Sequence, residues 1–279
     1  MKLAHHYYGK AKVRLMKVRR DGPRHALKEL EVSVMLQGDF EASYTGADNK
    51  LVVATDTMKN TVNILAWEKL GAENEEFALA LGKHFLQTYP QVGQVDIGLR
   101  ERCWDRLTVG GRPHDHSFAQ KDAAKPTVLA ICSRSSSSVE SGIEDLLILK
   151  TTGSGFEGFL KDKYTTLAET KDRIFATQLK AQWNYDKRPA SYSQTNASIL
   201  EAMLSVFASN YSPSVQVTLF EMGEAALKAA PEISKINLAM PNKHCLPINL
   251  APFGLDNRNE LFVPTDEPHG QIEGTVSRT

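Results

Sequence analysis

The segment Thr55-Asp56-Thr57 is the first candidate for chemistry, because the hydrophobic pattern of the chain changes there. An apolar run, residues 51–54, leads into it. Beyond it, the residues at the spacing of one helix face are Met58, Thr61, Val62, Leu65 and Ala66. This pattern predicts a helix that begins near Thr55. Its first turn would offer hydroxyls, a carboxylate and free backbone N–H groups to an anionic or carbonyl-rich ligand, although an ordinary helix cap has the same composition.

The stretch His114-Asp115-His116 has a spacing that also occurs in metal sites. No cluster of cysteines or carboxylates completes a coordination set, so we interpret it as the polar start of a hairpin strand and assign no metal. The cysteines Cys103, Cys132 and Cys245 are scattered without C-x-x-C spacing. This usage argues against a disulfide framework or a zinc ribbon and favours a reducing compartment.

The elements that must position these residues alternate between strands and helices. In the first half, residues 9–19 and 30–36 read as long strands joined by the turn Asp21-Gly22-Pro23. The helix at Thr55 and a second helix that ends before Pro90 follow. Further extended segments are expected at residues 95–99 and 118–132, with a turn at Gly110-Gly111 between them.

The polar run at residues 133–138 has no periodicity and is the expected joint between two halves. The same order of elements then recurs. Strands are expected at residues 139–152 and 175–183, helices at 200–208 and 215–230, and closing strands at 233–240 and within 245–276. A repeat of this length predicts two copies of one α+β unit, with domains at residues 1–136 and 137–279.

Composition limits the classes of function. A chain of 279 residues, 42% hydrophobic and 24% charged, is long enough for two ordinary cores. Lysine plus arginine equals aspartate plus glutamate, so no basic field favours nucleic acid or a membrane surface. No apolar run approaches the ~18 residues that a membrane span needs. We therefore expect neither nucleic acid nor a membrane among the partners.

The ends of the sequence bear on localisation. Residues 1–8 contain no apolar segment of the kind found in signal peptides. The ending Ser277-Arg278-Thr279 fits the Ser-Lys-Leu type of peroxisomal signal poorly, because its last residue is threonine. We expect a cytoplasmic protein, and a peroxisomal one only if the native C-terminus differs from this ending.

Several separate motifs, in order along essentially the whole chain, resemble the uricase (urate oxidase) family. They are Tyr8-Gly9-Lys10, Gly38-Asp39-Phe40, Val53-Ala54-Thr55-Asp56-Thr57-Met58-Lys59-Asn60-Thr61, Lys161-Asp162-Lys163-Tyr164-Thr165-Thr166-Leu167, Lys171-Asp172-Arg173, Ser214-Val215-Gln216 and Pro241-Asn242-Lys243-His244. The resemblance implies two tandem tunnelling-fold domains, each an antiparallel four-stranded sheet with two helices on one face. It implies oxidation of urate by dioxygen and water to 5-hydroxyisourate and hydrogen peroxide, in purine catabolism.

The resemblance also implies an assembly. Helices on one face leave the other face of each sheet without a partner, and an uncovered face with open edges favours association. The family likeness sharpens this expectation to a homotetramer with active sites at subunit interfaces.

Catalysis is assigned by the resemblance to Lys10, Thr55 and His244. Urate must lose a proton before it can give electrons to dioxygen. A lysine with a pKa lowered by desolvation can act as the base through a threonine hydroxyl or a water molecule, and a histidine can orient or exchange the proton near neutral pH.

Substrate binding is assigned in the same way. Arg173 would direct parallel N–H donors at a urate carbonyl and ring nitrogen, and Gln216 would pair with the opposite edge of the purine. Phe156 would stack on the ring. The remaining binding groups would be the backbone of Val215, the backbone N–H groups of Thr55 and Asp56, and Asn242, which would hold dioxygen or water above the ring plane.

Uricases resemble this chain in carrying a similar His-x-His stretch and in needing neither metal nor organic cofactor, so no cofactor is expected. Two alternatives stay open. A zinc-dependent pterin or purine hydrolase of the same fold would need Cys103, His114 and His116 as ligands. A non-catalytic purine-binding relative would be expected to lack Lys10, Thr55 or His244, all of which are present.

Overall fold

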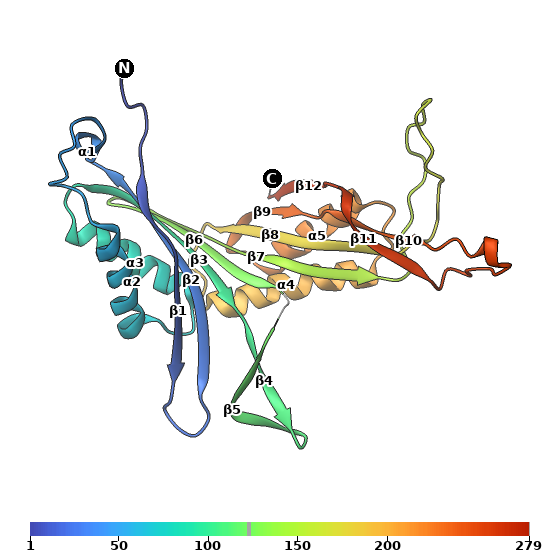
Figure 1. Cartoon of the computed structure of the whole chain (residues 1–279), viewed down its shortest axis with the longest axis horizontal. Coiled ribbons are helices and arrows are strands. Elements are labelled where there is room, and N and C mark those ends of the chain that lie inside the picture. Colours follow the sequence, from blue (N-terminus) through green and yellow to red (C-terminus); the bar gives the residue numbers. More distant parts are fainter. Residues whose placement is uncertain (122–123, 279) are drawn as a thin grey trace. The chain divides into compact units, whose positions relative to one another are not determined.

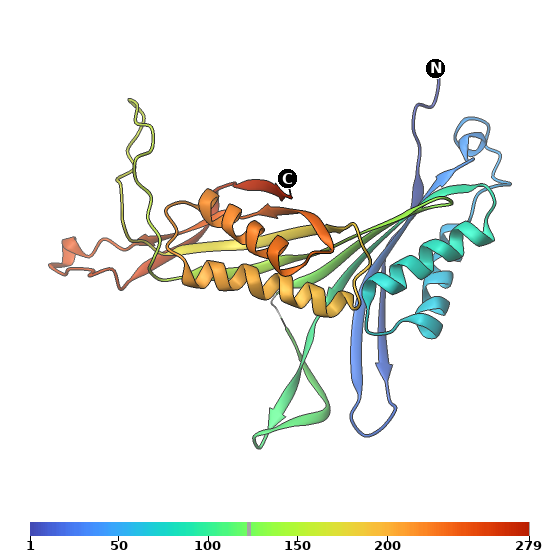
Figure 2. The ribbon, with the colours of Figure 1, turned by 180° about the vertical axis from the view of Figure 1, so that it is seen from behind.

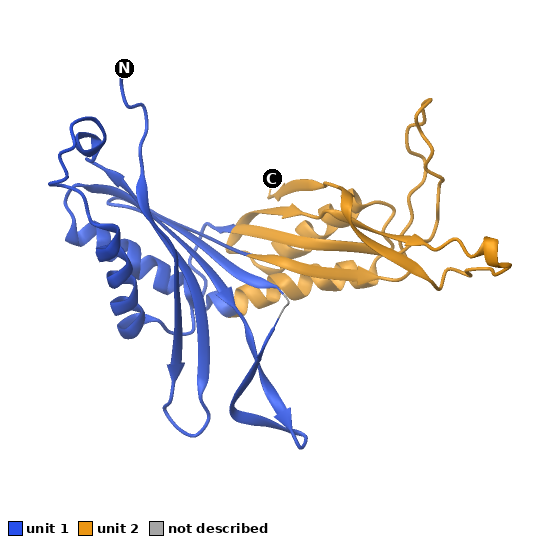
Figure 3. Ribbon diagram, viewed as in Figure 1, with its two compact units in different colours: residues 1–142, 184–193 blue, residues 143–183, 194–279 orange. Residues whose placement is uncertain are grey.

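The computed structural model describes residues 1–121 and 124–278, and the contacts within it group the chain into two units (Figure 3). Unit 1 contains residues 1–142 and 184–193, and unit 2 contains residues 143–183 and 194–279. Unit 1 is therefore completed by a segment that follows the first strands of unit 2. The predicted domains, 1–136 and 137–279, describe two copies of a fold and stay a prediction.

Unit 1 is built on an antiparallel sheet with the strand order β1, β2, β3, β6 (Figure 1). These strands are β1 (Tyr8–Arg19), β2 (Ala26–Gly38), β3 (Val92–Arg102) and β6 (Lys125–Ser133). The helices are α1 (Glu41–Thr45), α2 (Thr55–Lys69) and α3 (Asn74–Thr88). Helix α2 packs on β1, and α3 packs on β3 and β6. The sequence pattern gave no sign of the short helix α1.

The core of unit 1 follows directly from the two periodicities of the sequence. On β2, alternate residues from Leu30 to Leu36 are fully buried, as expected for a strand with one face against helices. On α2, the buried residues are Met58, Val62, Leu65 and Ala66, which is the predicted face. The predicted strands and helices of this core are confirmed.

A hairpin leaves this sheet as a separate two-stranded sheet, formed by β4 (Trp104–Val109) and β5 (Arg112–Gln120). Its turn uses Gly110 and Gly111, both with positive φ, as predicted. The extended segment expected around residues 118–132 is not one strand, because it contains the end of β5 and nearly all of β6. Residues 122–123 of that prediction lie outside the described residues.

The carboxylate of Glu29 joins this hairpin to the main sheet of unit 1. Glu29 is 6% exposed, and it accepts hydrogen bonds from Arg14 at 2.7 Å and from Trp104 Nε1 at 3.0 Å. Burial alone would raise the pKa of Glu29, but these donors outweigh it and lower the pKa below its ordinary value. Trp104 is the first residue of β4, so its hydrogen bond to the Glu29 carboxylate holds the base of the hairpin against the main sheet.

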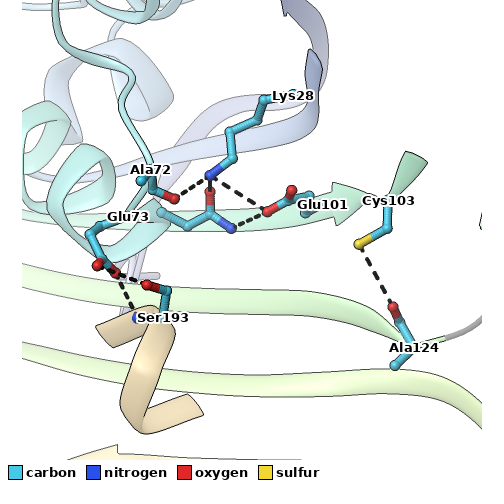
Figure 4. Close-up of polar contacts among 8 residues, drawn as sticks. Lys28, Ala72, Glu73, Glu101, Cys103, Ala124 and Ser193 are labelled. Atoms are coloured by element: carbon cyan, nitrogen blue, oxygen red, sulfur yellow. Dashed lines mark hydrogen bonds and ion pairs between the residues drawn. The ribbon is translucent and has the colours of Figure 1, made fainter. Parts of the chain in front are cut away.

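The late segment 184–193 completes unit 1 at the start of α3 (Figure 4). The carboxylate of Glu73 accepts hydrogen bonds from the backbone N–H of Ser193 at 2.7 Å and from its hydroxyl at 3.0 Å. On the same approach to α3, Lys28 donates to the carbonyl of Ala72 at 2.6 Å and to the Asn74 side chain at 2.7 Å. Polar contacts from distant parts of the chain thus hold the N-terminal end of this helix.

Unit 2 repeats the order of unit 1. Its strands are most of β7 (Ser137–Lys150), most of β8 (Phe175–Tyr185), β9 (Ile233–Ala239) and β12 (Glu273–Ser277). Most of α4 (Tyr192–Ser209) and all of α5 (Val215–Ala229) lie on one side of these strands (Figure 2). The hairpin of β10 (Asn242–Pro247) and β11 (Phe262–Gly270), with the 3-10 helix η1 (Ala251–Phe253) between them, has the same place in the chain order as β4 and β5, but β10 also pairs with β8. The expected repeat of one α+β unit is confirmed.

At the C-terminal ends of α2 and α5, a cationic side chain from another part of the chain binds the free carbonyls. Lys17 Nζ donates to the carbonyls of Ala66, Trp67 and Leu70 at the end of α2, each at 2.9 Å. Arg278 donates to the carbonyl of Ala230 at 3.1 Å and to that of Leu227 at the end of α5. A cation at a helix C-terminus satisfies free carbonyls and complements the helix dipole. Thr279, on which the localisation prediction partly rests, lies outside the described residues.

Candidate functional site

The first half of the site is the start of α2, which begins at Thr55 as predicted. Thr55 and Asp56 are exposed, so the first turn is open to a ligand. Asp56 accepts hydrogen bonds from Lys59 and from Asn60 Nδ2, the latter at 3.0 Å. The hydrogen bond from Lys59 lowers the pKa of Asp56, and the charge of Lys10 adds to the effect.

Lys10 lies on β1 immediately before a β-bulge. It is opposite Val34 of β2, and the register shifts between Lys10 and Val13. Lys12, inside the bulge, has a φ of 56°. Bulges re-aim the side chains beside them. Val34 is fully buried under the helices, and directly opposed residues share a sheet face, so Lys10 projects from the face that α2 covers.

Gly9 lets β1 approach β2 closely next to Lys10. A Cβ atom at this position would lie 1.8 Å from the carbonyl oxygen of Val34 and 2.8 Å from Met35 Cα. Both contacts are with backbone atoms, which cannot move aside without distorting the strand pair. The close approach of the two strands therefore requires a glycine between Tyr8 and Lys10.

Gly9→Ala should lower the free energy of unfolding by about 1–3 kcal/mol, because the added methyl group has no space between the strands. For a chain of this size, each kcal/mol lowers the Tm by about 2–4 °C, which scanning calorimetry can measure. Gly22→Ala is the matched control, since nothing lies within 4 Å of a Cβ atom there. Equal Tm values for the two variants would contradict the close approach at Gly9.

The second half of the site is organised around Phe156 and Arg173 in unit 2. The backbone N–H of Arg173 donates to the carbonyl of Ser154 at 2.7 Å, and Phe156 pairs with Thr170 in an antiparallel bridge. These bonds place the Arg173 guanidinium over the Phe156 ring, with Cζ 5.4 Å from the ring centroid. Burial lowers the pKa of Arg173 from its ordinary value, and its buried Nε has no hydrogen-bond partner among the described residues.

The start of α5 is bound to the same segment. Gly155 N–H donates to the carbonyl of Ser212 at 2.8 Å, and Ser214 caps α5 by accepting from Val217 N–H at 3.2 Å. Val215 and Gln216 are the first residues of α5; Val215 is buried and Gln216 is exposed. The predicted binding residues of these segments are thus connected by backbone hydrogen bonds rather than scattered.

Asn242 and His244 lie on β10. Asn242 is opposite Thr177 of β8 and Gly270 of β11, and the register shifts between Asn242 and His244. The carbonyl of His244 accepts a hydrogen bond from Thr265 at 3.2 Å. Both side chains are partly exposed and available to a ligand.

The candidate residues fall into two groups. Lys10, Thr55 and Asp56 belong to unit 1, whereas the group from Phe156 to His244 belongs to unit 2. In unit 1, the charge of Lys10 acts on Asp56 at the start of α2, and in unit 2, Arg173 lies over Phe156. Within the described residues, the hydrogen bonds and strand pairing of Asn242 and His244 connect them to β8 and β11 rather than to Arg173 or Phe156.

The structure also shows residues that sequence reasoning did not select. The ring of Phe159 stacks on that of Phe156 at 4.9 Å with an interplanar angle of 10°. Gly155 has no room for a side chain, because a Cβ atom would lie 2.9 Å from the Thr170 carbonyl oxygen and 2.2 Å from the Tyr211 hydroxyl. The aromatic pair at a spacing of three was visible in the sequence, but the contact with Tyr211 was not.

The histidines considered as metal ligands lie at the start of β5. The rings of His114 and His116 meet edge to face at 4.6 Å, and His25 lies 5.8 Å from His116. Cys103 Sγ faces the carbonyl of Ala124 at 4.0 Å (Figure 4). Across residues 1–121 and 124–278, no group of three or more metal-ligating side chains could hold an ion. The described residues therefore do not contain the ligand set that the zinc-dependent alternative requires.

Two repeated units of strands with paired helices define an α+β protein of two tandem tunnelling-fold units. The family model described as "Uricase" matches residues 6–131 and 139–273. The chain belongs to the uricase family.

The relatives cover nearly the whole chain. A uricase from Arthrobacter globiformis is 44% identical over 276 residues, which are 99% of this chain and 90% of the relative. A uricase from Dictyostelium discoideum is 43% identical, over 98% of this chain and 96% of the relative. The crystal structure of the Arthrobacter globiformis uricase matches with a TM-score of 0.95 and 43% identity, covering 100% of this chain and 95% of that one. No helix of the described residues is long and apolar enough to cross a membrane.

Proposed function

We propose that this chain is a urate oxidase that converts urate, dioxygen and water to 5-hydroxyisourate and hydrogen peroxide. Family membership supports the reaction. The observation that carries the site is the pair of Arg173 and Phe156, a partly buried guanidinium beside an aromatic ring, with an Nε–H that has no hydrogen-bond partner among the described residues. A planar anion with carbonyl groups fits such a pair, because it can stack on the ring and accept hydrogen bonds in its own plane.

Binding would use both edges of the purine. Arg173 donates to one edge, and the amide of Gln216, beside the backbone of Val215, pairs with the opposite edge. Phe156 stacks on the purine ring, and Phe159, which stacks on Phe156, supports it. The first-turn N–H groups at Thr55 and Asp56 bind the five-membered ring, and Asn242 holds dioxygen or water above the plane.

Proton transfer would be carried out by Lys10, Thr55 and His244. Lys10 accepts a proton from urate through the Thr55 hydroxyl or water, and His244 orients or exchanges that proton. The urate anion supplies the electrons to dioxygen, so the protein deprotonates, orients and excludes water. The reaction needs no metal or organic cofactor in this proposal, and its location would be cytoplasmic.

Purified protein treated with a chelator should oxidise urate at full rate, followed by loss of urate absorbance with hydrogen peroxide measured alongside. A preparation of Lys10→Met purified in the same way controls for contaminating oxidases. No consumption of urate would overturn the proposed function. Activity that disappears with the chelator and returns with zinc or copper would overturn only its cofactor-free form.

A homotetramer would complete the site. Leu147 and Leu149 on β7 are 64% and 50% exposed, and such apolar residues favour burial against another copy of the chain. We propose that Phe156, Arg173, Val215 and Gln216 come from one chain and that Lys10, Thr55, Asp56 and His244 come from its neighbour.

Refolding a mixture of Lys10→Met and Arg173→Ala should restore activity if sites are shared between chains. In a random mixture, about a quarter of the sites would combine two intact halves. If each site lay within one chain, every site would carry a defect and mixing would restore nothing. Mass measurement must confirm mixed oligomers, and the separately refolded variants give the baseline.

A further inference from the structure

The phenol of Tyr8 joins the start of β1 to the segment that enters α2. Its oxygen accepts a hydrogen bond from the backbone N–H of Val53 at 2.8 Å and donates to the carbonyl of the same residue at 3.1 Å. Tyr8 is half-buried, and its ring meets the buried ring of Phe40 edge to face at 4.9 Å. One side chain thus satisfies both polar backbone groups of a residue outside any strand or helix.

The position of this bridge relates it to the two catalytic candidates of unit 1. Tyr8 precedes Lys10 by two residues on β1, so the two side chains leave the same face of the strand. Val53 precedes Thr55 by two residues, just before α2 begins. Lys10 and Thr55 therefore each lie two residues along the backbone from one partner of the Tyr8–Val53 hydrogen bonds.

The other end of α2 is fastened to β1 separately. Lys17 donates to the carbonyls at the end of the helix, while Tyr8 holds the segment before its beginning. Helix α2 is consequently bound to one strand at both ends, with Lys10 and Thr55 at the Tyr8 end. A change at Lys17 should loosen the helix without directly moving these two residues.

The bridge needs the phenol in its protonated form, because a phenolate cannot donate to the Val53 carbonyl. Burial raises the pKa of Tyr8, although the hydrogen bond with Val53 acts in the opposite direction. The donor is therefore retained at neutral pH.

We propose that Tyr8 is a positioning residue that fixes the separation of Lys10 from Thr55 through its double hydrogen bond with Val53. The inference rests on the proposed catalytic roles of Lys10 and Thr55. Tyr8 itself does not contact the substrate, and it acts only through the residues that it positions. Its loss should consequently affect the rate of proton transfer more than the binding of urate.

Tyr8→Phe tests the bridge while it keeps the ring against Phe40. We expect kcat for urate to fall by about 10- to 100-fold with little change in KM, since a misplacement of catalytic groups by about 1 Å has effects of this size. Lys17→Met is the matched control. It should lower the Tm and leave kcat near the wild-type value, so the two variants separate positioning from general stability.

A double variant gives the sharper test. If Tyr8 acts through Lys10, Tyr8→Phe should lower kcat much less in a Lys10→Met background than in the wild type. An equal factor in both backgrounds, or a wild-type kcat for Tyr8→Phe alone, would overturn the inference while the proposed function stands. A wild-type chain without urate-oxidising activity would instead overturn the function and the inference together.

Hydrogen exchange of the unaltered chain tests the bridge without any variant. The Val53 amide should exchange slowly, although it lies outside the regular elements, because it donates to a half-buried phenol. Exchange at the rate of an unbonded amide would overturn the inference even if Tyr8→Phe did not fold.

Discussion

Lys10→Met should lower kcat for urate by about 10²- to 10⁴-fold and leave KM nearly unchanged, because a general base contributes to the barrier more than to ground-state binding. Methionine keeps the length of the side chain but cannot accept a proton. The groups proposed to bind the purine edges, Arg173 and Gln216, are unaltered by the change. Steady-state kinetics with urate, on protein shown to be folded by circular dichroism, provide the measurement.

Lys12→Met is the matched control for this prediction. Lys12 lies two residues away, inside the bulge that follows Lys10, and is exposed, so its replacement removes an equal charge from the same strand. Its kcat should remain within about twofold of wild type, as is usual for an exposed residue without partners in the site. A near-normal kcat for Lys10→Met would show that Lys10 is not the base.

Arg173→Ala should weaken the binding of urate by roughly 2–3 kcal/mol, which corresponds to a KM higher by about 30- to 150-fold. The guanidinium is partly buried over Phe156, and its Nε–H has no partner within the part of the chain that the structure describes. A ligand that fills this donor therefore gains a charge-assisted hydrogen bond. Equilibrium binding of a non-reactive purine anion, together with KM for urate, measures the effect.

Arg173→Lys distinguishes geometry from charge. Lysine keeps the positive charge but lacks the planar fork of donors, so it should recover only a small part of the lost affinity. Arg188→Ala is the control for the loss of an arginine, because Arg188 is 70% exposed and pairs with Glu76 at 2.7 Å. Urate binding by Arg173→Ala at the wild-type level would remove Arg173 from the site.

Local sequence patterns were sufficient for the elements with strong periodicity. The alternation on β2 and the helical spacing after Thr55 predicted a strand and a helix that the structure confirms. The short helix α1 was missed because its five residues bury no side chain and so give no periodic signal. The separation of β5 from β6 was missed because both are extended and no turn motif marks the break.

The site was less accessible to local reasoning. Lys10 and Arg173 would ordinarily be exposed surface residues, and only the likeness of several motifs to one family selected them. Their structural partners lie far away along the chain: Tyr8 reaches Val53, and Gly155 reaches Ser212. Such contacts form only in the completed fold, so residue types and spacing in the sequence do not predict them.

Residues 184–193 complete unit 1 but follow residues 143–183 of unit 2 in the sequence, and this order has a consequence for folding during synthesis on the ribosome. Chains emerge from the N-terminus, and domains commonly fold as soon as their residues are available. Glu73 and Glu76, however, receive Ser193 and Arg188 as partners only after the strands of residues 143–183 have already been made. The first half of the nascent chain must therefore wait, with the start of α3 incompletely bonded, until well over half of the protein has left the exit tunnel.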